Sequence, residues 1–189
     1  MKREALEGVE IQPEHYLEEA VRQFRKLKGL ADSAVAQVAD EDLFVMLDEE
    51  SNSIAIIMKH LAGNMQSRWR DFLTSDGEKP DRNRDSEFVL EDGETKNSVL
   101  ERWEDGWRCL FEALAPLTPK DLSRTVLIRG EPHSVMEAMN RQLTHYAYHV
   151  GQIVFLAKHF AAGKWQSLSI PRGKSQEFNA AMRKKRADA

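Results

Sequence analysis

The chain has 189 residues, of which 41% are hydrophobic and 31% charged, and its formal net charge is −4. This length supports one well-packed core, so we expect a single domain over residues 1–189, and the acidic balance gives no reason to expect nucleic acid as a partner. A charged start at Met1–Glu4, a lone cysteine and the lack of any long apolar run predict a cytoplasmic protein that binds no membrane.

Two amphipathic helices are predicted in the first third of the chain. Apolar residues recur every three or four positions from Pro13 to about Val38, which is the period of a helix with one buried face. A second such pattern follows Asn52 or Ser53, either of which can cap the helix, and we expect it to end near Ser75.

A long polar segment separates the second helix from the third. Residues 76–92 contain ten charged side chains, two of them arginines at Arg82 and Arg84. Loops of this length inside a domain are usually either disordered or functional, and the sequence leaves both interpretations open. A third helix is then predicted from Thr95 or Asn97, ending before Pro116.

The last part of the core combines a short extended element with a long helix. Residues 125–128 form a β-branched run, and the turn sequence around Gly130 predicts a short hairpin or extended ribbon. Ser134 and Glu137 form a capping-box pattern for a fourth helix that runs to about Phe160. Four long amphipathic helices predict an all-α protein with a four-helix bundle, in which the hairpin is an accessory element.

The fourth helix carries His145 and His149, which the helical repeat places on one face, one turn apart. A third histidine, His60 in the second helix, would complete a metal site with an open coordination position for chemistry. The pair alone is a weak signal, because two partly buried histidines that hydrogen-bond to neighbouring side chains would give the same pattern.

Three familiar site types do not fit the surrounding residues. A zinc peptidase of the thermolysin kind needs glutamate directly after the first histidine, and Tyr146 stands there. A di-iron carboxylate site needs a glutamate three residues before each histidine, where this chain has Gln142 and Ile57. A phosphate-binding loop ending at Gly173 would need glycine in place of Leu168.

Five further polar residues are candidates for orienting a ligand or binding substrate. Asn64 and Arg68 follow His60 at successive turns, and Gln152 follows His149 by three residues. Arg68 could also bind an anionic group such as a carboxylate, although an interhelical polar contact is the simpler explanation for it. Arg82 and Arg84 of the polar segment complete this set.

Taken together, several segments resemble the DUF1572 group of the DinB/YfiT-like superfamily. They are SNSIAIIMKHLAGNM (51–65), FLTSDGEKPDRNRD (72–85), IRGEPH (128–133), HYAYHVGQI (145–153) and LSIPRGKS (168–175). The resemblance implies a bundle of the DinB type, commonly a homodimer, with a divalent metal such as Zn or Ni held by His60, His145 and His149. Relatives in the superfamily include thiol transferases that use bacillithiol or mycothiol and a mycothiol-dependent maleylpyruvate isomerase.

Two classes of function follow from this resemblance. The first is a metal-dependent transferase that activates a low-molecular-weight thiol, such as bacillithiol, mycothiol or glutathione, for transfer to a small electrophile, with Asn64, Arg82 and Arg84 binding the polar groups of the thiol. The second is a non-enzymatic metal-binding or stress-response protein. A metal-dependent hydrolase ranks lower, because the sequence places no obvious carboxylate base beside the histidines.

Overall fold

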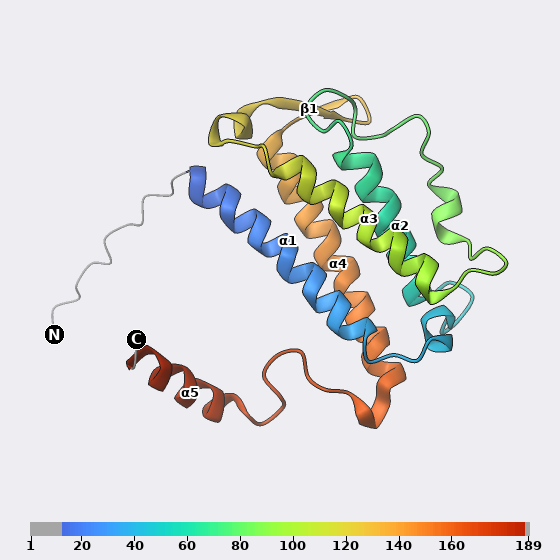
Figure 1. Cartoon of the computed structure of the whole chain (residues 1–189), viewed down its shortest axis with the longest axis vertical. Helices are drawn as coiled ribbons and strands as arrows, with labels where there is room; N and C mark the ends of the chain where they lie inside the picture. The colour runs from blue at the N-terminus through green and yellow to red at the C-terminus, as the bar shows by residue number, and fades with distance from the viewer. Residues whose placement is uncertain (1–12, 188–189) are drawn as a thin grey trace.

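A computed structural model describes residues 13–187 and shows a four-helix bundle with a hairpin at one end (Figure 1). The charged segment Met1–Glu4 lies outside the described residues. The helices are α1 (Pro13–Val35), α2 (Ile54–Trp69), α3 (Lys96–Leu114), α4 (Val135–Ala161) and α5 (Ser175–Ala187). The strands are β1 (Thr125–Ile128) and β2 (Glu131–Ser134). Short 3-10 helices are η1 (Glu41–Phe44), η2 (Asp85–Phe88), η3 (Pro119–Ser123) and η4 (Ala162–Lys164).

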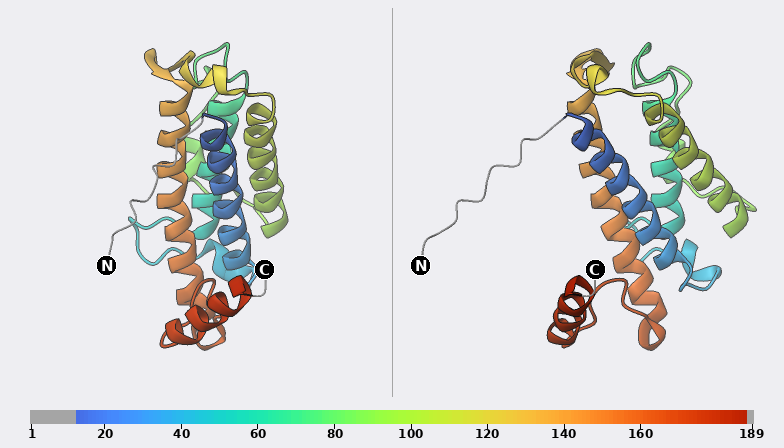
Figure 2. Two further views of the ribbon diagram at one scale, coloured as in Figure 1. Left: turned by 90° about the vertical axis from the view of Figure 1, so that its left-hand side faces the viewer. Right: turned by 60° about the vertical axis from the view of Figure 1, so that its left-hand side comes forward.

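The helix pairs explain the length of the polar segment between α2 and α3. Figures 1 and 2 show α1 and α4 running in one direction and α2 and α3 in the other, so that α2 and its neighbour α3 are parallel. A connection between parallel helices must return along the helix, and α3 with its 19 residues is about 28 Å long. Residues 70–95 make this return, and they pass over the outer side of α2.

Helix α2 is consequently enclosed. All but two of its 16 residues are buried, including Lys59, His60, Asn64 and Arg68. A helix that is surrounded in this way must satisfy its polar side chains inside the protein, because water does not reach them. The residues that reach those side chains come from α4 and from segment 70–95.

The capping residues set most helix starts as expected. The Ser53 hydroxyl accepts a hydrogen bond from the Ile56 N–H, and capping boxes begin α3 at Thr95 and α4 at Ser134. The predicted end of α2 near Ser75 is wrong. Helix α2 ends at Trp69, because Arg70 has an extended backbone and Asp71 a positive φ of 51°.

The predicted hairpin is confirmed, and it is attached to the start of the polar segment. Strands β1 and β2 pair antiparallel and turn through Arg129 and Gly130, both with positive φ. The Asp76 carboxylate accepts hydrogen bonds from the N–H groups of Arg129 and Gly130, at 2.8 and 2.7 Å. The hairpin and segment 70–95 therefore form one structure over this end of the bundle.

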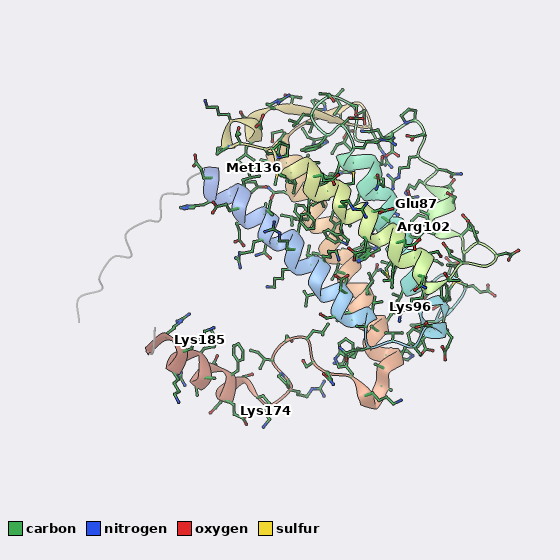
Figure 3. All side chains as sticks on the ribbon, viewed as in Figure 1. Glu87, Lys96, Arg102, Met136, Lys174 and Lys185 are labelled. Carbon is green, nitrogen blue, oxygen red and sulfur yellow. The ribbon has the colours of Figure 1, made fainter. Side chains whose placement is uncertain are left out.

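The C-terminal helix α5 lies apart from the other helices (Figure 2). Its residues with described side chains are all exposed, and Lys185 and the preceding Lys174 mark this separate region in Figure 3. Across residues 13–187, none of the helices combines the length and the apolarity that crossing a membrane requires.

Candidate metal centre

His60 of α2 meets His145 and His149 of α4 in the interior of the bundle. One ring nitrogen from each histidine lies within 4.8 Å of the other two, and Nε2 of His60 is 3.3 Å from Nε2 of His145. Two nitrogens bound to one tetrahedral ion at about 2.05 Å would be about 3.3 Å apart, so this pair already has the spacing that a metal such as zinc requires. The donor set of three imidazoles therefore fits a divalent metal and leaves a coordination position open.

Two hydrogen bonds orient the rings so that Nε2 is free to bind metal. Nδ1 of His60 lies 2.8 Å from the Glu87 carboxylate, and Nδ1 of His149 lies 2.7 Å from the Oε1 atom of Gln152. Both partners are acceptors, so each Nδ1 carries the proton and donates it, and the lone pair remains on Nε2. Gln152 therefore contacts His149, and its orienting role stays a prediction.

Glu87 itself is fixed from two sides. The guanidinium of Arg82 donates hydrogen bonds from Nε and Nη2 to the two carboxylate oxygens, at 2.8 and 2.9 Å, and both side chains are almost completely buried. Gly63 of α2 permits this approach, because a Cβ atom there would lie 2.4 Å from the Glu87 carboxylate. Figure 3 marks Glu87 beside the helices of the bundle.

Burial keeps the histidines of α4 neutral. It lowers the pKa of His145 to about 3, with the neighbouring imidazoles of His149 and His60 adding to the effect. Burial also lowers the pKa of His149, against the opposing influence of its hydrogen bond to Gln152. Neutral imidazole is the form that binds metal, so both ligands of α4 are in the binding form at neutral pH.

For Glu87, hydrogen bonds outweigh the effect of burial on the pKa. Its burial alone would raise the pKa of the carboxyl group, but the hydrogen bonds from His60 and Arg82 outweigh it and lower the pKa below its ordinary value. Glu87 is therefore ionised at neutral pH and presents a full negative charge to Nδ1 of His60.

Asn64 and Tyr146 belong to a buried polar chain beside the centre. The Tyr146 hydroxyl donates to Oδ1 of Asn64 at 3.1 Å and accepts from the indole N–H of Trp69 at 3.0 Å. Asn64 thus lines the pocket above the histidines while it satisfies the fully buried Tyr146. Its oxygen is already in use, which leaves the amide N–H groups for a ligand.

The three predicted arginines all line the same pocket, which has a volume of about 570 Å³ and the histidines in its wall. Arg68 donates to the Gly77 carbonyl and to Glu78, so its polar contacts join α2 to segment 70–95 and not to another helix. Arg84 lies over the ring of Phe88, with 4.9 Å between the guanidinium carbon and the ring centre. Arg82 orients Glu87 and also reaches the pocket.

The polar segment is ordered and contributes to the interior of the protein, because its own residues Lys79 and Glu87 are buried. The disordered interpretation that the sequence left open is therefore excluded. Glu87 places a carboxylate in contact with His60, but both of its oxygens are engaged by His60 and Arg82, so it does not supply the carboxylate base whose lack was noted in the sequence. No spacing rule identifies this contact, because 27 positions separate the two residues. No sequence pattern indicated a ligand-binding role for Arg129, Arg141 or Gln142, which the hairpin and α4 bring to the pocket wall.

Comparison with known families gives one match. The model of a family described as a protein of unknown function, DUF1572, matches residues 12–174, which include all three histidines and the whole of segment 70–95. No curated protein matches the chain.

Proposed function

The chain belongs to the DUF1572 family of the DinB/YfiT-like superfamily, and from this premise and the three-histidine centre we propose that it is a metal-dependent transferase for a low-molecular-weight thiol. The observation that carries the proposal is the convergence of three imidazole nitrogens on the wall of a pocket large enough for a small molecule. Three histidines leave a position open, whereas a structural zinc site has four protein ligands.

The chain's own residues would prepare this reaction in three ways. Glu87 and Gln152 hold His60 and His149 with Nε2 toward the common point. Asn64 and the arginines of the pocket wall would bind polar groups of the thiol and turn its sulfur toward the histidines. A divalent ion bound by these histidines supplies Lewis acidity, which lowers the pKa of a thiol at its open position.

The chemical step balances simply. The thiol loses its proton to solvent, the thiolate sulfur forms a bond to an electrophilic carbon, and the leaving group departs with the electron pair of the broken bond. Glu87 is not positioned as a base for this proton, because its two oxygens are engaged by Arg82 and by Nδ1 of His60. The same geometry gives no support to a hydrolytic reaction in which Glu87 would activate water.

Conjugation of a model electrophile tests the proposal directly. Protein loaded with Zn²⁺ or Ni²⁺ is incubated with bacillithiol, mycothiol or glutathione and with monochlorobimane, and formation of the fluorescent conjugate is followed. We expect a metal-dependent rate above the uncatalysed reaction for one of these thiols, and its loss in His149→Ala. An equal rate with and without protein for all three thiols would refute thiol transfer.

A purely structural metal site is the second candidate, and one observation favours it. His60 stands on α2 and the other two histidines on α4, so a bound ion would join the α2–α3 pair to the α1–α4 pair. Thermal unfolding with and without bound metal distinguishes the two candidates. A large fall in the melting temperature on metal removal, with no thiol conjugation by the loaded protein, would identify a structural role.

A homodimer is part of the same proposal, as the superfamily resemblance implies. Exposed apolar side chains on α4, Tyr148 and Phe155, would be available to such a contact. Sedimentation equilibrium of the full chain measures its mass in solution. A mass of one chain at all concentrations would exclude the dimer without affecting the proposed chemistry.

A further inference from the structure

The pocket above the histidines is lined by an unusual excess of positive charge. Its wall contains five arginines, which come from four separate parts of the chain: Arg68 of α2, Arg82 and Arg84 of segment 70–95, Arg129 of the hairpin turn and Arg141 of α4. Within residues 13–187, no aspartate or glutamate lines this wall. Segments that are far apart in sequence thus bring the same kind of side chain to one cavity.

Carboxylates behind the wall neutralise only part of this charge. Glu78 accepts hydrogen bonds from Arg68 and Arg129, both at 3.0 Å, and Glu87 accepts from Arg82. Two carboxylates therefore serve three arginines. Among the described residues, Arg84 and Arg141 form no ion pair with any carboxylate. The pocket keeps a surplus of positive charge before any metal is added.

Two buried polar atoms of the wall also lack a partner. Nε of Arg68 and Oε1 of Gln142 are each shielded from solvent without a hydrogen bond, and the two residues are 6% and 3% exposed. A buried donor or acceptor without a partner is unfavourable, so each of these atoms calls for a partner such as a water molecule or a bound ligand. Arg68 offers a donor for an anionic oxygen, and Gln142 an acceptor for a hydroxyl or amine of the same ligand.

We propose that this pocket binds a small molecule with a doubly negative group, either a phosphate or a pair of carboxylates, held by Arg84 and Arg141 at the mouth and by Arg68 further in. Guanidinium groups bind both kinds of group through paired hydrogen bonds, and a dianion matches the unneutralised charge better than a single carboxylate. The inference rests on the proposed small-molecule site at the histidines, but it does not depend on thiol transfer.

Binding of simple anions tests this assignment. Isothermal titration of the full chain at pH 8 and constant ionic strength measures the dissociation constants of inorganic phosphate and of succinate, with neutral succinamide as the control of equal length. We expect at least one dianion to bind and succinamide not to bind. In the double variant R84Q/R141Q, the dissociation constant should rise about tenfold or more, because two charge-assisted contacts are lost.

A matched variant controls for the change in net charge. R25Q/R172Q removes two exposed arginines that lie outside the pocket, and Arg25, like Arg84, lies near a phenylalanine ring and forms no ion pair with any residue of 13–187. This variant should bind the anion like the wild-type protein. All four arginines are exposed, so both variants should keep the wild-type melting temperature.

The variant H145A/H149A separates the anion site from the metal. Anion binding that persists there and still depends on Arg84 and Arg141 supports the inference, even if the protein conjugates no thiol. Anion binding that disappears with the histidines and is unchanged in R84Q/R141Q would show that the anion binds the metal, and would overturn the inference. Failure of both dianions to bind the wild-type protein would overturn it as well.

Discussion

The two sides of the histidine centre are supported in different ways. On the α4 side, a neutral amide one turn away in the same helix orients His149. On the α2 side, a charged carboxylate from a distant segment orients His60, and a buried arginine holds that carboxylate in turn. The α4 side is therefore built by local helix geometry, and the α2 side depends on the long connection being packed correctly over the bundle.

Loss of a histidine ligand should reduce Zn²⁺ affinity the most, and the reduction should be equal for a ligand on α2 and a ligand on α4. We expect His60→Ala and His149→Ala each to weaken Zn²⁺ binding by more than roughly 100-fold, beyond the range for residues that only orient a ligand. Competition with a zinc-binding dye measures the affinity. His159→Ala changes an exposed histidine of the same helix and should have no effect. If only one of His60→Ala and His149→Ala weakened Zn²⁺ binding, the three histidines would not share an ion.

Glu87→Gln should have the next largest effect. A glutamine can still accept the hydrogen bond from His60, but it removes the charge that strengthens His60 as a ligand and compensates the buried Arg82. We expect Zn²⁺ affinity to fall about 10- to 100-fold and the free energy of unfolding to fall by about 3–5 kcal/mol. Urea denaturation and the dye competition measure the two quantities.

The double variant R82Q/E87Q separates the two effects of Glu87. It tests whether the loss of stability comes from the contact with Arg82 and the loss of metal affinity from the contact with His60. It removes both members of the buried pair, so most of the stability should return, because no uncompensated charge remains. The metal affinity should stay low, since the charge facing His60 is still missing. Asp92→Asn is the control for the surface of the same segment, because Asp92 is exposed. Recovery of the metal affinity in the double variant would contradict the orienting role of Glu87.

Gly63→Ala should affect the same contact from the α2 side. The added methyl group would lie 2.4 Å from the Glu87 carboxylate, so Glu87 must move away from His60 or segment 70–95 must shift. We expect a loss of Zn²⁺ affinity of about tenfold, although alanine is normally better than glycine in a helix by up to about 1 kcal/mol. Gly151→Ala in α4 is the matched control, because its methyl group meets nothing within 4 Å. That control should keep its metal affinity and gain stability, and equal behaviour of the two variants would disprove the close approach.

The same contrast explains what the sequence could and could not predict. The helices, their starts at Ser53, Thr95 and Ser134, and the pairing of Gln152 with His149 follow from periodicity and capping, which act over a few residues. His60 could be proposed as the third ligand from the residues alone, but the helical pattern does not fix which faces meet, and the family resemblance strengthened that hypothesis.

Glu87 and two of the five wall arginines, Arg129 and Arg141, could not be predicted from the sequence. In the sequence, Glu87 is one of ten charged residues in a polar segment, and no feature of spacing or propensity distinguishes it from Glu91. Its role comes from the parallel arrangement of α2 and α3, which forces the connection to return over His60. Arg129 and Arg141 reach the pocket only because the hairpin and α4 close its rim. Contacts of this kind depend on the tertiary structure, which single-sequence patterns do not encode.

Gln152→Ala should reduce Zn²⁺ affinity the least. Compared with Glu87→Gln, it measures the difference between the support of His149 and the support of His60. The amide is neutral, half-buried and replaceable by water, so its loss leaves no buried charge behind. We expect Zn²⁺ affinity to fall by about tenfold at most, with little change in the free energy of unfolding. The same dye competition compares it with Glu87→Gln in one experiment. Gln23→Ala on the exposed face of α1 is the control. A loss as large as that of Glu87→Gln would mean that the local contact orients its histidine as strongly as the charged one, and the proposed asymmetry of the centre would be wrong.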